Sequence, residues 1–117
     1  MANRFINKKI NLTSTDNTTI FTVPTATTSI VRSILVSEYA GSGSTLTVTL
    51  TDSSGTVFNL FTSKTISSNT TTELLTNPLI LQESEVLKVQ AADANRLQVI
   101  VSILEVQPRT VLGGAAS

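Results

Sequence analysis

Residues 45–51 read Thr45-Leu46-Thr47-Val48-Thr49-Leu50-Thr51, an unbroken alternation of hydroxyl and aliphatic side chains. Successive side chains of a β-strand point to opposite faces of the sheet, so this stretch predicts a strand with one apolar and one hydroxyl face. The same pattern recurs along the chain, because twenty of its 117 residues are Thr and fourteen are Ser. We therefore expect an all-β protein.

Short turn signals separate eight or nine such segments, and none of them has a helical period. For example, Asp52-Ser53-Ser54-Gly55 predicts a hairpin turn, because Asp bonds its own backbone and Gly accepts the left-handed conformation. The regular spacing favours an antiparallel β-sandwich of 8–9 strands, of jelly-roll or immunoglobulin-like topology. The expected strands cover residues 3–12, 18–23, 29–37, 45–51, 56–61, 70–75, 79–81, 86–91 and 96–106.

The length fits one domain, which we divide into three parts. Residues 1–12 are expected to form an N-terminal arm or edge strand, residues 13–107 the β-sandwich, and residues 108–117 a C-terminal tail. Pro108 ends the last strand, since proline cannot donate to a ladder.

Two strands carry apolar residues on both faces. In residues 29–37, uninterrupted alternation predicts Ile30, Ile34 and Val36 on one face and Val31 and Leu35 on the other. Arg32 falls within the first set, so it should lie near a rim or pair with a carboxylate. In the last strand Leu97, Val99, Val101 and Ile103 share one face, and Ile100, Leu104 and Val106 share the other. The second set needs a cover, either the chain's own N-terminal strand or a long loop, or a neighbouring subunit.

The composition offers little for chemistry. The chain has no His, Cys or Trp, which removes the usual general base, thiol nucleophile and zinc ligands. We therefore expect that the protein is not an enzyme and that it binds no cofactor and no metal ion. Eight basic residues balance eight acidic ones, so no long-range field would attract nucleic acid or an anionic membrane. The start of the chain does not read as a secretory signal, and synthesis in a cytoplasm is expected.

Three stretches of the sequence share a recognisable pattern. They are Phe21-Thr22-Val23-Pro24 followed by a small polar run and Ile30-Val31-Arg32-Ser33-Ile34, then residues 79–91, and the final strand 97–106. These stretches resemble small β-sandwich virion proteins of tailed bacteriophages. The likeness covers most of residues 18–106. The acidic turn departs from it, because Gln82-Glu83-Ser84 stands where many such proteins have Pro-Gly-Asp or Ala-Gly-Asp.

The resemblance implies a structural role in a virion. The leading interpretation is a capsid decoration or cement protein that binds the major capsid protein, or other virion proteins, and forms a homotrimer. The alternative is a tail, neck or baseplate module, including a host-receptor-binding domain. Candidate contact residues lie in two arms, although the same residues would also serve to close their own sandwich. They are Phe5, Ile6, Arg109, Val111 and Leu112.

Overall fold

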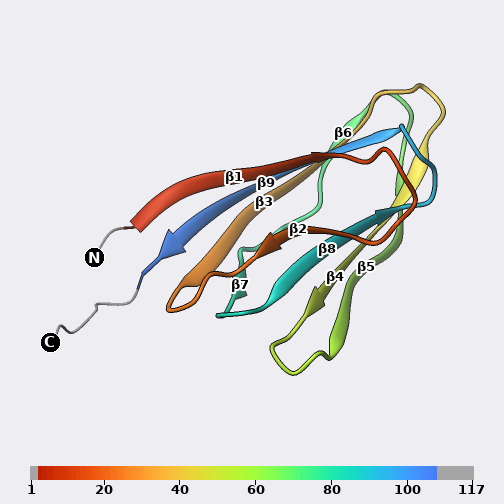
Figure 1. The fold of residues 1–117 in the computed structure, drawn as a ribbon. Coiled ribbons are helices and arrows are strands. Elements are labelled where there is room, and N and C mark those ends of the chain that lie inside the picture. The colour runs from red at the N-terminus through yellow and green to blue at the C-terminus, as the bar shows by residue number, and fades with distance from the viewer. Residues whose placement is uncertain (1–2, 108–117) are drawn as a thin grey trace, which may run out of the picture.

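The computed structural model describes residues 3–107, which form two antiparallel sheets packed face to face (Figure 1). No helix occurs in this part of the chain. The strands are β1 (Asn3–Asn11), β2 (Thr18–Thr22), β3 (Thr28–Glu38), β4 (Ser44–Thr51), β5 (Val57–Ile66), β6 (Thr71–Glu73), β7 (Leu79–Leu81), β8 (Val86–Ala91) and β9 (Leu97–Val106).

The strand order is that of a jelly roll. Sheet A runs β1-β9-β3, with β6 and β7 one after the other along the far edge of β3, and sheet B runs β2-β8-β4-β5. The pairs are nested: β1 with β9, β2 with β8, β3 with β6 and β7, and β4 with β5. A long hairpin rolled across two sheets produces this nesting. The predicted β-sandwich is confirmed. Of the two topologies left open above, the strand order is that of the jelly roll and differs from that of the immunoglobulin fold.

Alternate residues of the two sheets meet in the core. On β9 the inward set is Leu97, Val99, Val101 and Ile103, as predicted from the alternation. Each aliphatic side chain enclosed in this way stabilises the fold by about 1.5–3 kcal/mol relative to exposure. The other large enclosed side chains are Leu12, Val23, Val31, Ile34, Val36, Leu46, Val48, Ile66, Leu81 and Leu87.

A β-bulge in β3 corrects one prediction. The register between β3 and β9 shifts between Val31 and Ser33, which leaves Arg32 as the extra residue. The bulge changes the parity of the alternation, so Val31 and Ile34 both face the core while Ile30 faces outward. The grouping of Ile30 with Ile34 was therefore wrong, as was that of Val31 with the outward-facing Leu35.

Arg32 is exposed within this bulge. The two ion pairs formed within residues 3–107 join Arg4 to Glu105 and Arg96 to Asp93, so Arg32 has no carboxylate partner there. Of the two alternatives expected for Arg32, a position near a rim or pairing with a carboxylate, the pairing does not occur in the part of the chain that the structure describes.

Two carboxylates organise the loops. The hairpin predicted at residues 52–55 is confirmed: Asp52 accepts hydrogen bonds from the backbone of Ser54 and Thr56, and Gly55 takes a φ of +92°. Glu38, at the end of β3, is buried and accepts backbone hydrogen bonds from all three residues 41–43 at 2.9–3.2 Å. A fourth bond, from the Asn69 N–H at 2.9 Å, links the β3–β4 loop to the β5–β6 loop.

Candidate interaction surface

An apolar row crosses the outer face of sheet A near the end where β1 begins. Phe5 of β1 is in register with Leu104 of β9, Leu104 with Ile30 of β3, and Ile30 with Ile80 of β7. Opposed residues of neighbouring strands share a face and lie about 5 Å apart, so the four form one continuous line. We call Phe5, Leu104, Ile30 and Ile80 the apolar row.

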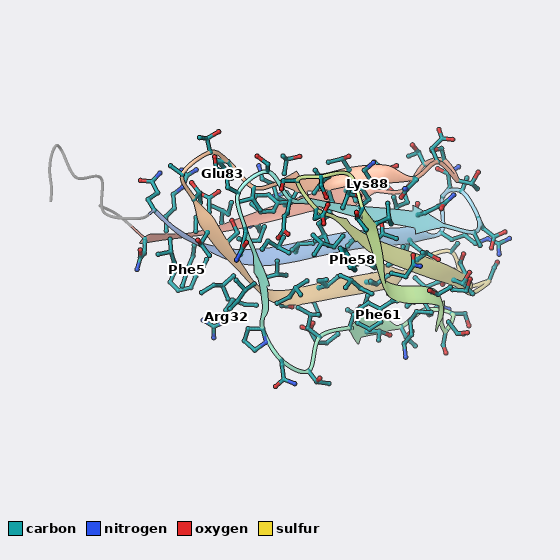
Figure 2. The ribbon with its side chains drawn as sticks, turned by 90° about the horizontal axis from the view of Figure 1, so that it is seen from below. Phe5, Arg32, Phe58, Phe61, Glu83 and Lys88 are labelled. Atoms are coloured by element: carbon teal, nitrogen blue, oxygen red, sulfur yellow. The ribbon has the colours of Figure 1, made fainter. Side chains whose placement is uncertain are left out.

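The apolar row is open to solvent at both ends. Phe5 is 75 % exposed and Ile80 is 60 % exposed, while Leu104 and Ile30 between them are half-buried. Ile100 also faces outward on β9 and is 41 % exposed, but it is separated from the apolar row by Ser102, which lies opposite Asn7 and Ser33. Figure 2 shows Phe5 at the end of the molecule where β1 begins, away from Phe58 of β5. A contiguous apolar patch of this kind marks an interaction surface.

The N-terminal strand does not supply the cover expected for the outward face of β9. β1 pairs with β9 edge to edge in the same sheet, so it leaves Ile100 and Leu104 without a layer above them. The alternative in which the chain's own N-terminal strand covers this face was therefore wrong. No loop within residues 3–107 encloses Ile100 either, given its exposure.

The outer face of sheet B is more polar over β4 and β8, where Thr47 lies opposite Gln90 and the buried Thr49 lies opposite Lys88. Sheet B also has exposed apolar residues, but they lie on its edge strand β5, where Val57 is 55 % and Phe58 51 % exposed. On sheet A the outward apolar residues form a line across four strands, so its outer face is the better candidate for burial against another surface.

The free edges of the sheets carry features that oppose strand addition. Lys8 of β1 is in register with the inward-facing Val101, and a lysine on that side of an edge strand hinders a further strand. Strands β6 and β7 have three residues each, with Pro78 between them. On β5, Ser63 has a φ of +48° and the register with β4 shifts. Association through the outer face of sheet A is thus favoured over association through an edge.

Glu73 provides hydrogen-bond acceptors for the part of the β3 edge that lies between β6 and β7. Its carboxylate accepts hydrogen bonds from the Ile34 N–H at 2.9 Å, the Leu75 N–H at 3.1 Å and the Ser33 hydroxyl. Burial acts to raise the pKa of Glu73 and is the largest single influence. The three hydrogen bonds together outweigh it, so the pKa lies below its ordinary value.

A polar pair lies behind the apolar row on the inner face of sheet A. Arg4 Nε donates to Glu105 Oε1 at 2.8 Å, and Glu105 is buried while Arg4 is largely exposed. Ser29 of β3 is opposite Glu105, and its buried hydroxyl has no hydrogen-bond partner among the described residues. The pair fixes the start of β1 to the end of β9, which holds Phe5 beside Leu104.

The predicted contact residues fall in different places. Phe5 and Ile6 are neighbours in sequence but lie on opposite faces of β1: Phe5 belongs to the apolar row, and Ile6 packs against the molecule's own core. The predicted Arg109, Val111 and Leu112 lie outside the described residues.

Sequence reasoning missed two members of the row. Ile30 was grouped with Ile34 and Val36 on one face, because nothing in the sequence marks the bulge at Arg32. Ile80 lies within the apolar run Leu79-Ile80-Leu81. The available signal was that this strand is apolar on both faces, so one apolar side chain had to face outward.

Within residues 3–107 no group of three acidic side chains is placed to hold a metal ion, and no helix is long and apolar enough to cross a membrane. The chain matches no protein-family model and no curated protein sequence.

Proposed function

We propose that this chain is a structural virion protein of a tailed bacteriophage, of the capsid decoration or cement type. It acts without bond-making chemistry, by binding the outer capsid surface and stabilising the shell. The observation that carries the proposal is the apolar row, a line of exposed side chains across four strands of sheet A. The sequence resemblance described above supports the assignment to a virion.

Shell stabilisation follows from burial across a joint between subunits. A protein that covers apolar surface on two neighbouring capsid subunits adds about 25 cal/mol for each Å² removed from water to the free energy of separating them. Repetition over many joints adds avidity, because each bound copy holds several contacts at once. The partner in this proposal is the major capsid protein, and the resemblance favours a homotrimer as the attached form.

Cosedimentation with capsids tests the proposal. Purified chain is added to capsids of its phage that lack it, and the bound fraction is compared for the natural sequence, Ile80→Thr and Phe5→Ser. We expect at least about tenfold weaker binding for both variants, since losing contacts worth about 1.4 kcal/mol changes affinity tenfold. Phe58→Ser is the matched control, because Phe58 is an exposed aromatic residue on the other sheet.

Two results would overturn the proposal. One is equal binding of Phe5→Ser, Ile80→Thr and Phe58→Ser to the capsid. The other comes from quantitative mass spectrometry of virions. A copy number of only a few per particle would assign the chain to a tail, neck or baseplate, whereas a decoration protein is present in many copies per shell.

A further inference from the structure

We infer that residues 3–12 form an exchangeable segment: β1 and the following Leu12 leave the sandwich of their own chain and take the same place in a second copy. The receiving surface is the edge of β9 that the second copy's own β1 vacates. The inference goes beyond the proposed function and does not rest on it, because it concerns contacts between copies of this chain alone.

β1 is the least enclosed of the longer strands. None of its nine side chains is fully buried, and only Ile6 and Ile10 are half-buried. Every other described strand of more than three residues has at least one buried side chain. Local stability follows the apolar contacts that an element makes, so β1 should detach more readily than the strands around it.

Detachment of β1 disturbs no other strand pairing among residues 3–107. β1 pairs with β9 alone, at the edge of sheet A, and β9 keeps β3 on its other side (Figure 1). The one buried residue of the segment is Leu12, whose N–H donates to the Leu97 carbonyl at 3.0 Å. The rest of the sandwich therefore keeps its architecture when the segment leaves.

Residues 13–17 provide the hinge. All five side chains are exposed, and none of these residues has a positive φ, so extended backbone is open to each of them. Gln90 Nε2 donates to the Thr15 carbonyl at 2.9 Å, at an exposed position where water can replace it. Five extended residues span about 17 Å, enough to pass between the surfaces of two touching sandwiches.

The vacated edge of β9 selects β1 of a second copy. Nine consecutive residue pairs join the two strands without a bulge. Glu105 is buried at this edge and loses its ion-pair partner Arg4 when β1 leaves. An unpaired buried carboxylate is costly, so the edge favours a strand with a cation at that position. A second copy's β1 supplies this cation and also places Ile6 and Ile10 against the core in the same register.

Replacement of β1 is favoured over addition of a strand outside it. Lys8 is in register with the inward-facing Val101 and hinders a further strand beyond β1. The edge of β9 itself has only aliphatic inward residues next to β1 from Leu97 to Ile103. Closed and exchanged forms make the same contacts, so concentrating the copies favours exchange.

Disulfide trapping between full-length copies tests the inference. The chain has no cysteine, so introduced thiols have no natural competitor. The single variants Asn7→Cys and Ser102→Cys place thiols at register partners on β1 and β9. They are mixed, treated with oxidised glutathione and separated on a non-reducing gel, and the dimers are identified by mass. We expect a mixed disulfide-linked dimer whose yield rises with protein concentration.

The matched control combines Asn7→Cys with Gln98→Cys. Gln98 lies on the same face of β9 as Ser102 but is the partner of Asn11, four residues out of register with Asn7. We expect the in-register pair to cross-link at least about tenfold faster, since a seated β1 raises the effective concentration of its thiol at one position only. Equal rates would overturn the inference.

A second pair separates exchange from contact between two outer faces. Ile10 and Val99 are register partners on the inner face, and Val99 is fully buried, so only a strand in the place of β1 reaches it. We expect Ile10→Cys and Val99→Cys to give a mixed dimer as well, and Ile6→Cys with Ile103→Cys replaces this pair if either variant does not fold. If only the outward pair cross-links, the inference is wrong and the copies meet through the outer face of sheet A.

Discussion

Glu38 shows how one residue can connect two loops that are distant in sequence. The Asn69 N–H is the largest influence on its pKa and lowers it, burial opposes this effect, and the N–H groups of residues 41–43 lower it further. The net pKa lies below the ordinary 4.5. The sequence indicates a turn at residues 41–44. It could not reveal that the Glu38 carboxylate joins this turn to Asn69, because Asn69 lies 31 positions from Glu38 in the sequence.

We predict that Glu38→Gln lowers the stability of the fold at neutral pH. A glutamine offers one uncharged acceptor oxygen in place of two charged ones, so the four backbone donors are less well satisfied. Because folding lowers the pKa of Glu38, its contribution is present above the ordinary value of 4.5 and is lost as the pH falls through the lowered value. Urea unfolding midpoints of the two proteins should therefore converge as the pH falls below 4.5 and through the lowered pKa of Glu38.

The control for this prediction is Glu83→Gln, which changes the charge by the same amount at an exposed turn residue (Figure 2). Its unfolding midpoint should stay close to that of the natural chain at neutral pH. A Glu38→Gln protein as stable as Glu83→Gln at pH 7 would contradict the role assigned to Glu38.

At the scale of the element, the strands were predicted well and their irregularities were not. All nine strands fall within or beside the expected segments, because alternation and turn residues are local signals. β5 nevertheless continues to Ile66, beyond the expected end at Phe61, through a register shift at which Ser63 N–H bonds the Thr47 hydroxyl. Bulges depend on the partner strand, so a single strand's sequence does not reveal them.

The bulge in β3 leads to a prediction about Arg32. Arg32→Ala should change the free energy of unfolding by less than about 0.5 kcal/mol, because the side chain is exposed and has no ion pair among the described residues. Deletion of Arg32 removes the extra residue and leaves Val31 opposite Ile103 and Ser33 opposite Ser102 in unbroken alternation, so the flanking side chains keep their faces. We therefore expect the deletion to cost well below the roughly 2–5 kcal/mol of an emptied core site.

Denaturant titration followed by circular dichroism measures both changes. A loss of several kcal/mol for the deletion would contradict the assignment of Arg32 as the extra residue of the bulge. The apolar row depends on this assignment, because the extra residue allows Ile30 to face outward while Ile34 faces the core.

At the scale of the whole molecule, the nested pairing brings the most distant strands together. β1 pairs with β9 over its full length, and Arg4 bonds Glu105 across 101 positions. The sequence predicted a sandwich but not this order, because apolar alternation states which face is buried and leaves the neighbour of each strand unspecified. The apolar row could not be predicted for the same reason, because its residues come from four strands whose order in the sheet the sequence does not specify.

Non-local pairing predicts slow folding. Closing the loop between β1 and β9 costs chain entropy before any of its contacts form, and proteins dominated by such pairings refold in milliseconds to seconds. Stopped-flow dilution from urea, followed through the single tyrosine Tyr39, would measure the rate. Refolding complete within microseconds would contradict a fold that forms through contacts between its two ends.

The register of β1 and β9 also sets how the molecule bears tension. Asn3 and Val106 are direct partners, so the first residue of β1 and the last residue of β9 lie side by side. A force that separates these two residues loads the hydrogen bonds of the ladder one pair at a time, whereas a force along the strands would load all of them at once. Mechanical opening between these two points would therefore begin at the Asn3–Val106 pair, with the paired strands unzipping from there.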